Sequence, residues 1–521
     1  MKVIQEIPLK VSPLVQDLLN QDENVRPFIS DFFTKENCFA AARNRSFSKE
    51  KRSVLSTQLI QQYQQLVLSE QLDRNIELLR LENTFTVVTG HQICSSGGPL
   101  YLIYKLFTAI RITQELNKIQ TEFNFVPVYW MATEDHDIEE IRHFHWGNEK
   151  VELATEFEGI AGELPTKEFY SWLNERKAEG KFNEIGLSEL FIQAYSKNNF
   201  TEATRFWVNE LLGEFGLVCI DGNDKELKEL AASLFDKEIQ EEFIFSEVSK
   251  TNVALKNSGY SPNIQPREFN LFWLKERGEL KIRKRIDKNG AQFQTSDGDR
   301  YFTKLELSEI SGAISPNVLL RPLYQETILP NIAYIGGPSE LRYWLQLKNA
   351  FQAANLQMPL LVHRISMVLV RKRDIEFVAK NDLDIAELVQ EKLHNAQKKM
   401  LGAMNVKSFE NETSETLKSF ENLRHYISEI DSSLVGWLSA EEKRQLDQWA
   451  NIEQKIKKAI KSKEEVKFSQ LEKFFAFTHP NHIQQERVFS LLYATEIVGW
   501  KDLKEMLEGL DPFKHSSIIA G

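Results

Sequence analysis

The fold of this chain is decided by the stretch Thr86-Val-Val-Thr-Gly-His-Gln-Ile-Cys-Ser-Ser-Gly-Gly-Pro-Leu-Tyr-Leu-Ile-Tyr-Lys105. The order of its residue types predicts a buried strand, a tight turn at Gly97 and Gly98, and a helix opened by Pro99. A helix N-terminus at a glycine turn can bind a phosphate or a carboxylate, although a purely structural turn is the alternative. The spacing matches neither the GxGxxG fingerprint of dinucleotide sites nor a P-loop.

Similar strand–helix units recur along the chain. We expect strands at residues 85–89, 125–132, 216–220 and 331–335. The helices expected to follow them span residues 100–117, 225–240 and 339–353, and helical periodicity also runs from 53 to 81. Because these short strands are almost entirely apolar, they are typical of a parallel sheet with both faces covered. The sequence therefore predicts an α/β fold.

Other segments interrupt this rhythm, and a chain of 521 residues is long enough for about two to four domains. Residues 155–205 are polar and helical, while residues 268–304 read as β-hairpins. The predicted organisation is a helical lead-in and first part of the core (1–154), a helical insertion (155–205), core (206–267), a β-hairpin insertion (268–304), core (305–379), a helical coiled-coil domain (380–470) and a C-terminal helical segment packed on the body (471–521).

The C-terminal third has a different pattern, in which apolar residues recur at three- and four-residue steps. They are Leu417, Phe420, Leu423, Ile427, Ile430, Leu434, Trp437, Leu446, Trp449, Ile452, Ile456 and Ile460. This spacing predicts a long antiparallel helical pair with coiled-coil character. Ser439-Ala-Glu-Glu442 fits a capping box that would start its second helix. The charged faces are either simply solvated or part of a dimer.

Composition restricts the possible function. Lys and Arg number 64 against 75 Asp and Glu, which gives a net charge of −11 and argues against a broad nucleic-acid-binding face. The N-terminal residues lack the apolar core of a signal peptide, and no apolar run reaches the roughly 20 residues that span a bilayer. Cys38, Cys94 and Cys219 are dispersed without CxxC spacing. We expect a soluble, cytoplasmic protein.

Four consecutive ionisable residues, Glu134-Asp135-His136-Asp137, directly follow the second predicted strand. Ligands of open α/β sheets bind beyond the carboxyl ends of the strands. Flanking carboxylates can fix the tautomer of His136 and raise its pKa for proton transfer, which makes these four residues candidate catalytic groups. The alternative is that Asp135 or Asp137 caps the next helix.

Two other chemistries are weaker alternatives in the same region. His136, His143 and His145, together with the neighbouring aspartates, offer mixed nitrogen and oxygen ligands for a metal. No HExxH or CxxC motif supports this, and His143 and His145 look like one face of a strand. Cys94 could be a nucleophile if the helix N-terminus stabilised its thiolate.

A second strand ends in Gly336-Gly337-Pro338 and leads into a helix with Ser339 and Glu340 in its first turn. Arg321 and Gln325 lie shortly upstream, where the guanidinium could grip a carboxylate and the amide could add a donor. Two such turns in one sheet could place two anion-binding helix ends around one crevice. The alternative is that both turns have these residues for structural reasons only and bind no ligand.

Taken together, the motifs resemble the BshC family, the cysteine-adding enzymes of bacillithiol synthesis. The resemblance covers essentially the whole chain. The motifs that carry it are Thr89-Gly-His-Gln92, Gly98-Pro-Leu-Tyr101, Glu134-Asp-His-Asp137, Arg321-Pro-Leu-Tyr-Gln325, Gly336-Gly-Pro-Ser-Glu340 and Gln484-Gln-Glu-Arg487. Two departures are His91, where many members have Gln, and Glu326, where Asp is common.

The resemblance implies a Rossmann-like core of the nucleotidyltransferase type, connecting-peptide insertions, a coiled-coil domain and a homodimer. It implies a ligase that joins the carboxyl of L-cysteine to the amine of glucosaminyl malate. ATP with magnesium is the expected source of carboxyl activation, and no tightly bound metal is predicted. The expected substrate- or nucleotide-binding residues are Gly90, His91, Gln92, Gly97, Gly98, Tyr101, Lys105, Arg321, Gln325, Gly336, Gly337, Ser339 and Glu340. Two alternatives are a non-catalytic pathway scaffold and a synthetase or nucleotidyltransferase for another small acid.

Overall fold

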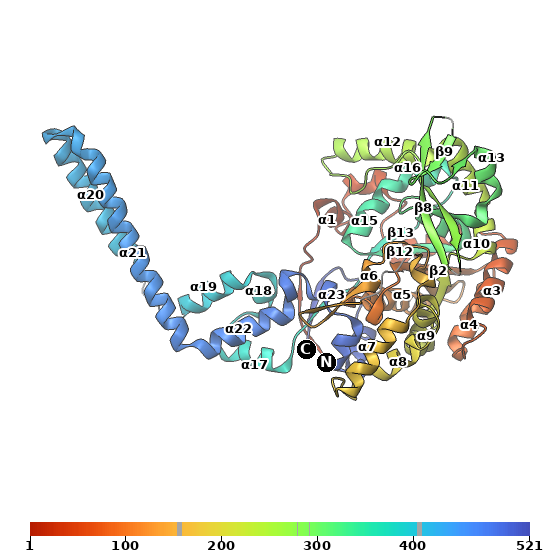
Figure 1. Cartoon of the computed structure of the whole chain (residues 1–521), viewed down its shortest axis with the longest axis horizontal. Coiled ribbons are helices and arrows are strands. Elements are labelled where there is room, and N and C mark those ends of the chain that lie inside the picture. Colours follow the sequence, from red (N-terminus) through yellow and green to blue (C-terminus); the bar gives the residue numbers. More distant parts are fainter. Residues whose placement is uncertain (154–158, 279, 291, 404–408) are drawn as a thin grey trace. The chain divides into compact units, whose positions relative to one another are not determined.

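The computed structural model describes residues 1–153, 159–278, 280–290, 292–403 and 409–521 (Figure 1). The chain forms two compact units, a larger one of Met1–Leu369 and Ile483–Gly521 and a smaller one of Val370–His482. The predicted boundary between residues 154 and 155 lies outside the described residues. In the described ranges, we find no helix that combines the length and apolar character needed to span a bilayer.

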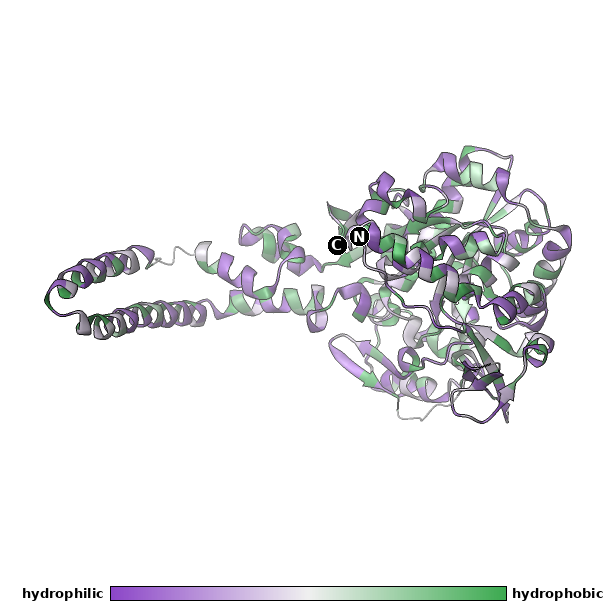
Figure 2. Ribbon diagram, turned by 90° about the horizontal axis from the view of Figure 1, so that it is seen from above, coloured by the Kyte–Doolittle hydropathy of each residue, from purple (hydrophilic) through white to green (hydrophobic). Residues whose placement is uncertain are grey.

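A five-stranded parallel sheet forms the core of the larger unit. Its strands are β2 (Thr84–Gln92), β3 (Asn124–Ala132), β6 (Val218–Asp221), β12 (Asn331–Gly336) and β13 (Leu360–His363). Nearly every residue of these strands is buried, because helices cover both faces. Figure 2 shows these hydrophobic strands in the interior of the larger unit. The predicted parallel sheet is confirmed.

The spatial order of the strands is β13-β12-β2-β3-β6, so the chain runs outward from β2 in one direction and from β12 in the other. This is the doubly wound Rossmann order, and its switch point lies between β2 and β12. The helix that follows β2, α5 (Leu100–Ile119), packs on one face of the sheet together with α2 (Lys35–Asn44). The carboxyl ends of β2 and β12 therefore meet at one edge, where this fold places ligands.

The helix that follows β12 covers the opposite face. Ala333 and Ile335 of β12 pack in the core cluster that contains α5 residues. Tyr334, between them, points to the other side and stacks on Trp344 of α15 (Pro338–Trp344) with ring centroids 4.0 Å apart. Alternation along the strand thus assigns the two helices to different faces.

Further helices surround the sheet. They are α1 (Pro13–Leu19), α3 (Lys49–Tyr63), α4 (Glu70–Leu78), α10 (Lys225–Glu229), α11 (Ala232–Glu241), α12 (Phe243–Asn257), α13 (Lys304–Glu309), α14 (Arg321–Ile328) and α16 (Lys348–Ala353). Short 3-10 turns occur at Glu23–Phe28, Ser311–Ala313 and Leu345–Leu347.

Two helices predicted as continuous are each divided in the structure. Residues 225–240 form α10 and α11, because Ala231 leaves helical geometry at φ −104° and ψ 7°. Residues 339–353 form α15 and α16, separated by the 3-10 turn Leu345–Leu347. There the buried Gln346 side chain accepts hydrogen bonds from the backbone N–H groups of Asn263 and Ile264 (3.1 and 3.0 Å). Apolar periodicity continues across both breaks, so the sequence did not reveal them.

Two insertions leave the core. The first contains α6 (Glu139–Arg142), the hairpin β4 (His143–Trp146) and β5 (Glu149–Glu152), the 3-10 turn Ala161–Glu163, α7 (Lys167–Ala178), α8 (Ser188–Tyr195), α9 (Phe200–Leu212) and the 3-10 turn Gly213–Phe215. The second is an antiparallel sheet of β7 (Leu271–Arg277), β8 (Leu280–Asn289), β9 (Gln292–Thr295), β10 (Tyr301–Phe302) and β11 (Ile314–Pro316). Hairpins were expected in this second region.

The end of the chain returns to the larger unit. It contains α23 (Gln485–Val488), α24 (Leu491–Val498), α25 (Trp500–Glu508) and β15 (Ser517–Ala520). In a three-stranded sheet, β15 pairs antiparallel with β1 (Val3–Ile7) and parallel with β14 (Ser366–Leu369). The two chain ends therefore lie side by side, as the N and C labels in Figure 1 indicate.

The smaller unit is helical. It contains α17 (Lys372–Lys380), α18 (Ile385–Gln390), α19 (Leu393–Ala403), α20 (Glu410–Ile430), the 3-10 turn Ser432–Leu434, α21 (Val435–Lys463), α22 (Glu465–Thr478) and the 3-10 turn Pro480–His482. The long helices α20 and α21 pair antiparallel (Figures 1 and 2). Trp449 Nε1 of α21 donates to the Thr416 hydroxyl of α20 (3.0 Å). The unit extends beyond the predicted limits of 380 and 470.

The predicted capping box at Ser439-Ala-Glu-Glu442 is wrong. Ser439 lies inside α21, where its hydroxyl donates to the carbonyl oxygen of Val435 one turn earlier (3.0 Å). The break between the helices occurs at Asp431, whose carboxylate accepts the backbone N–H of Ser433 (2.9 Å). Serine followed by glutamate also occurs within helices, so the motif alone did not locate the turn.

Candidate active site

A cavity of about 900 Å³ lies at the carboxyl ends of β2, β3 and β12, where the β7–β8 hairpin also approaches. It is located at the switch point of the sheet, as expected for a Rossmann-like fold. The predicted site residues that line it are Gly90, His91, Gln92, Tyr101, Lys105, Glu134, Asp135, His136, Asp137, Arg321, Gly337, Ser339 and Glu340. The sheet thus gathers residues that are more than 200 positions apart in sequence.

The first glycine turn is arranged differently from the expectation. Gly97 is packed so closely that a Cβ atom there would lie 2.7 Å from the Phe191 ring and 3.0 Å from Leu491. At the start of α5, the backbone N–H of Leu100 donates to the carbonyl oxygen of Phe489 (2.8 Å). Gly98 borders a separate cavity of about 140 Å³. Protein groups, including a backbone carbonyl, therefore pack closely around Gly97 and the start of α5, whereas Gly98 faces the smaller cavity.

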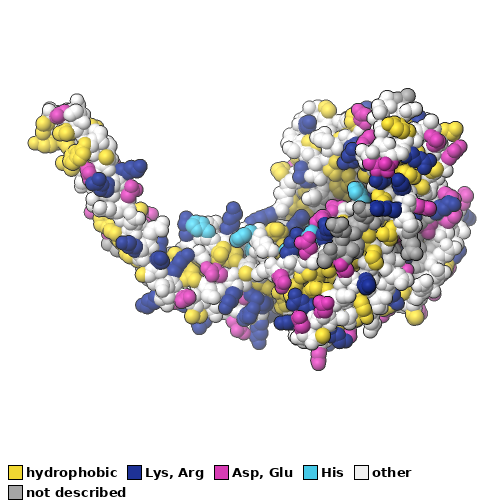
Figure 3. Space-filling view, viewed as in Figure 1, with side chains coloured by type: hydrophobic (Ala, Val, Ile, Leu, Met, Phe, Trp, Pro, Cys, Tyr) yellow, Lys and Arg dark blue, Asp and Glu magenta, His cyan; other side chains and the backbone are white. Residues whose placement is uncertain are grey.

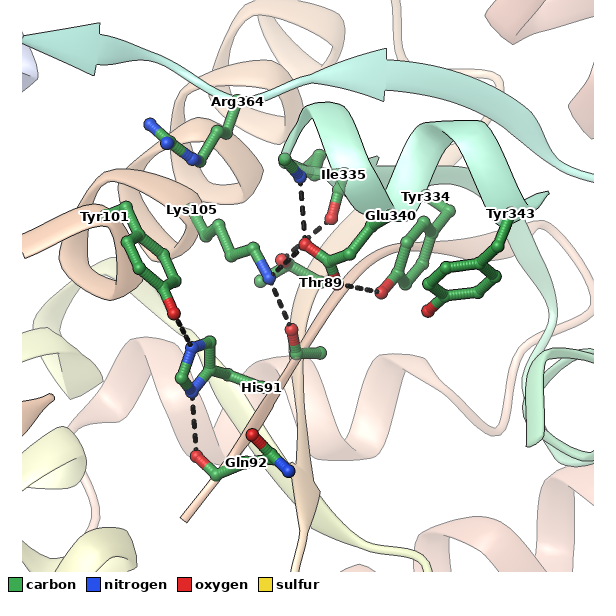
Figure 4. Close-up of polar contacts among 12 residues, drawn as sticks. Thr89, His91, Gln92, Tyr101, Lys105, Tyr334, Ile335, Glu340, Tyr343 and Arg364 are labelled. Carbon is green, nitrogen blue, oxygen red and sulfur yellow. Dashed lines mark hydrogen bonds and ion pairs between the residues drawn. The ribbon is translucent and has the colours of Figure 1, made fainter. Parts of the chain in front are cut away.

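An ion pair between Lys105 and Glu340 connects the β2 and β12 sides of the cavity (Figure 4). Lys105 Nζ lies 2.5 Å from Glu340 Oε2 and donates to the carbonyl oxygen of Gly90 (2.8 Å). Glu340 also accepts hydrogen bonds from the Gly337 N–H (2.9 Å) and the Tyr334 hydroxyl (3.0 Å). Burial alone would raise the pKa of Glu340, but the charge of Lys105 brings it below its ordinary value. Glu340 therefore stays ionised and caps α15.

Two further cations face the cavity. Arg321 donates to the side-chain oxygen of Gln325 (3.1 Å) and to the Tyr343 hydroxyl (3.3 Å). Gln325 itself is fully buried behind Arg321, so it positions the guanidinium. Arg364 follows β13 and makes a two-pronged contact with Glu486 (2.6 and 2.9 Å). Its Nε atom is buried without a hydrogen-bond partner among the described residues.

Asp135 organises the end of β3. Its Oδ2 accepts a hydrogen bond from Gln92 Nε2 (2.8 Å), and its Oδ1 accepts the backbone N–H of His136 (2.7 Å). Arg283 Nη1 lies 3.4 Å from both Asp135 Oδ1 and His136 Nδ1. The His136 ring packs near Phe272, with centroids 5.4 Å apart. These contacts hold His136 at the mouth of the cavity, with about half of its side chain exposed.

Glu134 and Asp137, the other two of the four consecutive ionisable residues after β3, have structural partners. Glu134 forms a buried ion pair with Lys228 (2.9 Å). Asp137 Oδ1 accepts the backbone N–H of Glu139 at the start of α6 (3.3 Å). Asp137 thus makes the cap-like contact that the alternative reading anticipated, while it also lines the cavity.

The expected rise in the pKa of His136 is wrong in direction. Burial lowers the pKa of His136, and the nearby charge of Arg283 lowers it further, which outweighs the opposing effect of Asp135 and Asp137. The sequence showed the adjacent carboxylates but not an arginine almost 150 residues away. A lowered pKa keeps the imidazole neutral at pH 7, the form that can accept a proton.

Two alternatives from the sequence, Cys94 as a nucleophile and a metal site that includes His136, His143 and His145, find little support. Burial and the charge of Glu140 raise the pKa of the Cys94 thiol well above its ordinary value, which disfavours a free thiolate nucleophile. His143 lies close to Glu139 and Glu152 (2.8 and 3.3 Å). Together with His145, it lines the smaller cavity instead of meeting His136.

Sequence reasoning missed Arg283 and Arg364. Arg364 immediately follows an apolar strand, the same signal that drew attention to Glu134, so it could have been found. Arg283 lies in β8, and alternation in that hairpin indicates its face but not its neighbours. The buried partner of Arg364, Glu486, lies in a motif that was noted only for its resemblance to a family.

The fold and the cavity define a Rossmann-like α/β protein with a cavity lined by charged and polar side chains at the carboxyl edge of its sheet. Residues 1–365 match the family model for the bacillithiol biosynthesis BshC N-terminal Rossmann-like domain, and residues 367–520 match that for the BshC C-terminal coiled-coil domain. The chain therefore belongs to the BshC family.

Individual relatives agree with the family models. A Cytophaga hutchinsonii protein named "Putative cysteine ligase BshC" is 33% identical over 519 residues, covering 96% of this chain and 95% of the relative. A Flavobacterium johnsoniae protein of the same name is 35% identical over 488 residues, covering 91% of each chain. A Bacillus cereus protein with this name is 26% identical and covers 97% of both chains. The similarity thus spans both units.

Proposed function

We propose that this protein is a ligase that forms an amide bond between the carboxyl of L-cysteine and the amine of glucosaminyl malate, which yields bacillithiol. The observation that carries the proposal is the composition of the cavity in a BshC-family chain. Cationic side chains line one part of the cavity, and a histidine held by a carboxylate lines another. Amide formation from an amino acid and an amine needs both kinds of group.

The cations suit the negative charges of both proposed substrates. Glucosaminyl malate carries carboxylates, and cysteine carries one more. Arg321 and Arg364 can each present N–H groups to a carboxylate, and guanidinium groups bind carboxylates well because the two shapes match. The unpartnered, buried Nε atom of Arg364 supports a role in binding a polar ligand.

His136 is the proposed general base. The amine nitrogen gives up one proton before it attacks and another as it becomes the amide nitrogen. His136 is partly exposed and stays neutral at pH 7 because its pKa is lowered. Asp135 and Arg283 lie on the Nδ1 side of the ring, which leaves Nε2 on the other side.

Carboxyl activation is assigned to ATP with magnesium, because condensation of a free carboxylate with an amine is uphill in water. In the net reaction, one carboxylate oxygen leaves cysteine with a phosphorus-containing product of ATP. Lys105 and the arginines line the same cavity, and positive charge of this kind stabilises phosphate oxygens. A protein that makes this cellular thiol would act in the cytoplasm.

A direct assay tests the proposal. Purified full-length protein is incubated with L-cysteine, glucosaminyl malate, ATP and magnesium, and products are measured by liquid chromatography and mass spectrometry. We expect the amide product together with one cleaved nucleotide per product. Cells without the protein should accumulate glucosaminyl malate and lack bacillithiol. Nucleotide cleavage that depends on another amino acid, and not on cysteine, would contradict the assignment.

We further propose that the helical pair of the smaller unit mediates a homodimer. Large apolar side chains are exposed around the turn between α20 and α21, where Figure 3 shows them gathered at one end of the pair. Tyr426, Ile430 and Trp437 have exposed fractions of 63%, 65% and 58%. Exposed apolar patches of this kind are typical of interaction surfaces.

The dimer is tested by charge substitution. Ile430→Lys combined with Trp437→Lys should reduce the mass measured by multi-angle light scattering from a dimer to a monomer. Val466→Lys serves as the matched control, because Val466 is an exposed apolar residue of the same unit but lies in α22. An unchanged mass in the double variant would reject this surface as the interface.

A further inference from the structure

Three potential metal ligands meet between β2 and α6. They are Nδ1 of His91, Sγ of Cys94 and Oε2 of Glu140, which all lie within 4.8 Å of one another. Cys94 Sγ lies 3.4 Å from His91 Nδ1 and 3.0 Å from Glu140 Oε2, and the Nδ1–Oε2 distance is 3.8 Å. None of the three side chains belongs to the cations or to the general base described above.

The triangle formed by these atoms has the size of one face of a tetrahedral zinc site. Zinc bonds of about 2.0–2.3 Å at tetrahedral angles place neighbouring ligand atoms about 3.3–3.6 Å apart. The observed separations of 3.0, 3.4 and 3.8 Å bracket this value. Thiolate, imidazole and carboxylate are the ligand types that zinc uses, and three protein ligands leave a fourth position open.

The ligands are held by their surroundings. His91 Nε2 lies 3.0 Å from the Tyr101 hydroxyl, and a hydrogen on Nε2 leaves the Nδ1 lone pair for a metal. The Tyr195 hydroxyl donates to the carbonyl oxygen of Cys94 (3.2 Å) and fixes the turn that carries the thiol. His91 Nδ1 also lies 2.8 Å from the carbonyl oxygen of Gln92, which can only accept a hydrogen bond, so metal binding requires the ring hydrogen to move from Nδ1 to Nε2 and this contact to break.

We propose that His91, Cys94 and Glu140 bind one Zn²⁺ ion whose fourth position takes the thiolate of the substrate cysteine. His91 and Glu140 line the main cavity, which places two of the three ligand residues at its wall, and the proposal assigns the open position to that side. Cys94 and the incoming thiol each release one proton to solvent, and no oxidation or reduction occurs. The thiolate part of this inference rests on the proposed function. The metal site itself rests on the geometry.

The role of such a site follows from ligand chemistry. Zinc binds a soft thiolate more strongly than a hydroxyl, so it would distinguish cysteine from serine, which has nearly the same shape. Fixing the sulfur would also fix the direction of the cysteine carboxyl within the cavity. The site would therefore select and orient the amino acid, while the amine is deprotonated at His136.

Cobalt substitution tests the site without measuring activity. The full-length protein is treated with a chelator and titrated with Co²⁺, which replaces Zn²⁺ and reports thiolate ligands through a charge-transfer band in the near ultraviolet. We expect one equivalent of Co²⁺ to produce the band. Cys94→Ser should abolish it, and Glu140→Gln should weaken Co²⁺ affinity at least about tenfold. Cys219→Ser is the matched control, because Cys219 is also a buried free cysteine.

Addition of substrate completes the test. L-cysteine should intensify the charge-transfer band, whereas L-serine should leave it unchanged. A protein that forms bacillithiol but shows no cobalt–thiolate band would overturn the metal site and leave the proposed function intact. A band that requires Cys94 but ignores L-cysteine would overturn the thiolate assignment. Because Glu140 is partly exposed, Glu140→Gln gives a second readout if Cys94→Ser fails to fold.

Discussion

The two Gly-Gly-Pro turns of the sheet have similar sequences but different surroundings. Gly97 and Gly98 lie in a turn packed against Phe191 and Leu491, and the first N–H of the following helix is bound by the carbonyl oxygen of Phe489. Gly337, in the second turn, borders the main cavity. The first turn is therefore closely packed at Gly97, whereas the second turn borders the main cavity at Gly337.

Positive charge at this edge of the sheet comes from side chains and not from the helix ends. The N-terminus of α15 is capped by Glu340, and that of α5 is bound by a backbone carbonyl, so side chains must supply the charge. Lys105, Arg321 and Arg364 do so from three separate elements. Glycine turns shape the carboxyl edge of this sheet, and cationic side chains line the cavity there.

The largest expected effect concerns the main cavity. His136→Asn should lower the rate of bacillithiol formation by about 10² to 10⁴-fold, because the variant lacks a general base. The melting temperature should change little, since about half of the side chain is exposed. His143→Asn is the control, because His143 borders the smaller cavity near the first turn. Equal rates for the His136 variant and the unmodified protein would place the chemistry elsewhere.

The two turns themselves should differ in their tolerance of side chains. Gly97→Val should lower the free energy of unfolding by about 2–5 kcal/mol, because the backbone has φ +74° and the new side chain would overlap Phe191. Gly337→Ala should be nearly neutral, since its φ is −78° and a Cβ atom meets its neighbours at 3.6 Å. Urea unfolding followed by tryptophan fluorescence measures both. Similar losses would show that the two turns are equally packed.

A smaller effect is expected from the cations. Arg321→Lys should raise the KM for glucosaminyl malate about tenfold with little change in kcat, because a single ammonium cannot replace a two-pronged guanidinium contact. Arg342→Lys, on the exposed side of α15, should leave both constants unchanged. Steady-state kinetics separate the two parameters. A fall in kcat alone would instead indicate a role in the reaction step.

The smallest effect is a shift in pH dependence. A general base acts when deprotonated, so if His136 has this proposed role the rate should fall as the pH drops through its folded-state pKa, which burial holds below the ordinary value. Arg283→Gln removes a charge that lowers this pKa, so the acid limb should move upward in pH. Arg285→Gln, which removes an exposed arginine of the same strand, should leave it in place. An acid limb unaffected by Arg283→Gln would show that Arg283 does not face the titrating group.

Much of the site could be predicted because it lies at strand ends. Glu134–Asp137 and Gly337 follow buried strands directly, and strands of a parallel sheet bring such positions to one edge. The sequence correctly placed Gln325 beside Arg321, because residues four apart on a helix contact each other. It did not show that the Gln325 side chain is fully buried behind Arg321. The capping box at Ser439 failed since local spacing cannot distinguish a helix start from a helix interior.

The sequence by itself determined the parallel sheet, the helical pair and the family, because short apolar strands, heptad-like spacing and contiguous motifs are local properties. Only the tertiary structure decided which glycine turn meets the cavity, since Phe489 and Leu491 come from the end of the chain. It also decided the direction of the His136 pKa shift, because burial lowers this pKa and Arg283, which comes from a separate hairpin, lowers it further. Charge and packing act through space, so contacts between distant segments fixed the chemistry that local patterns left open.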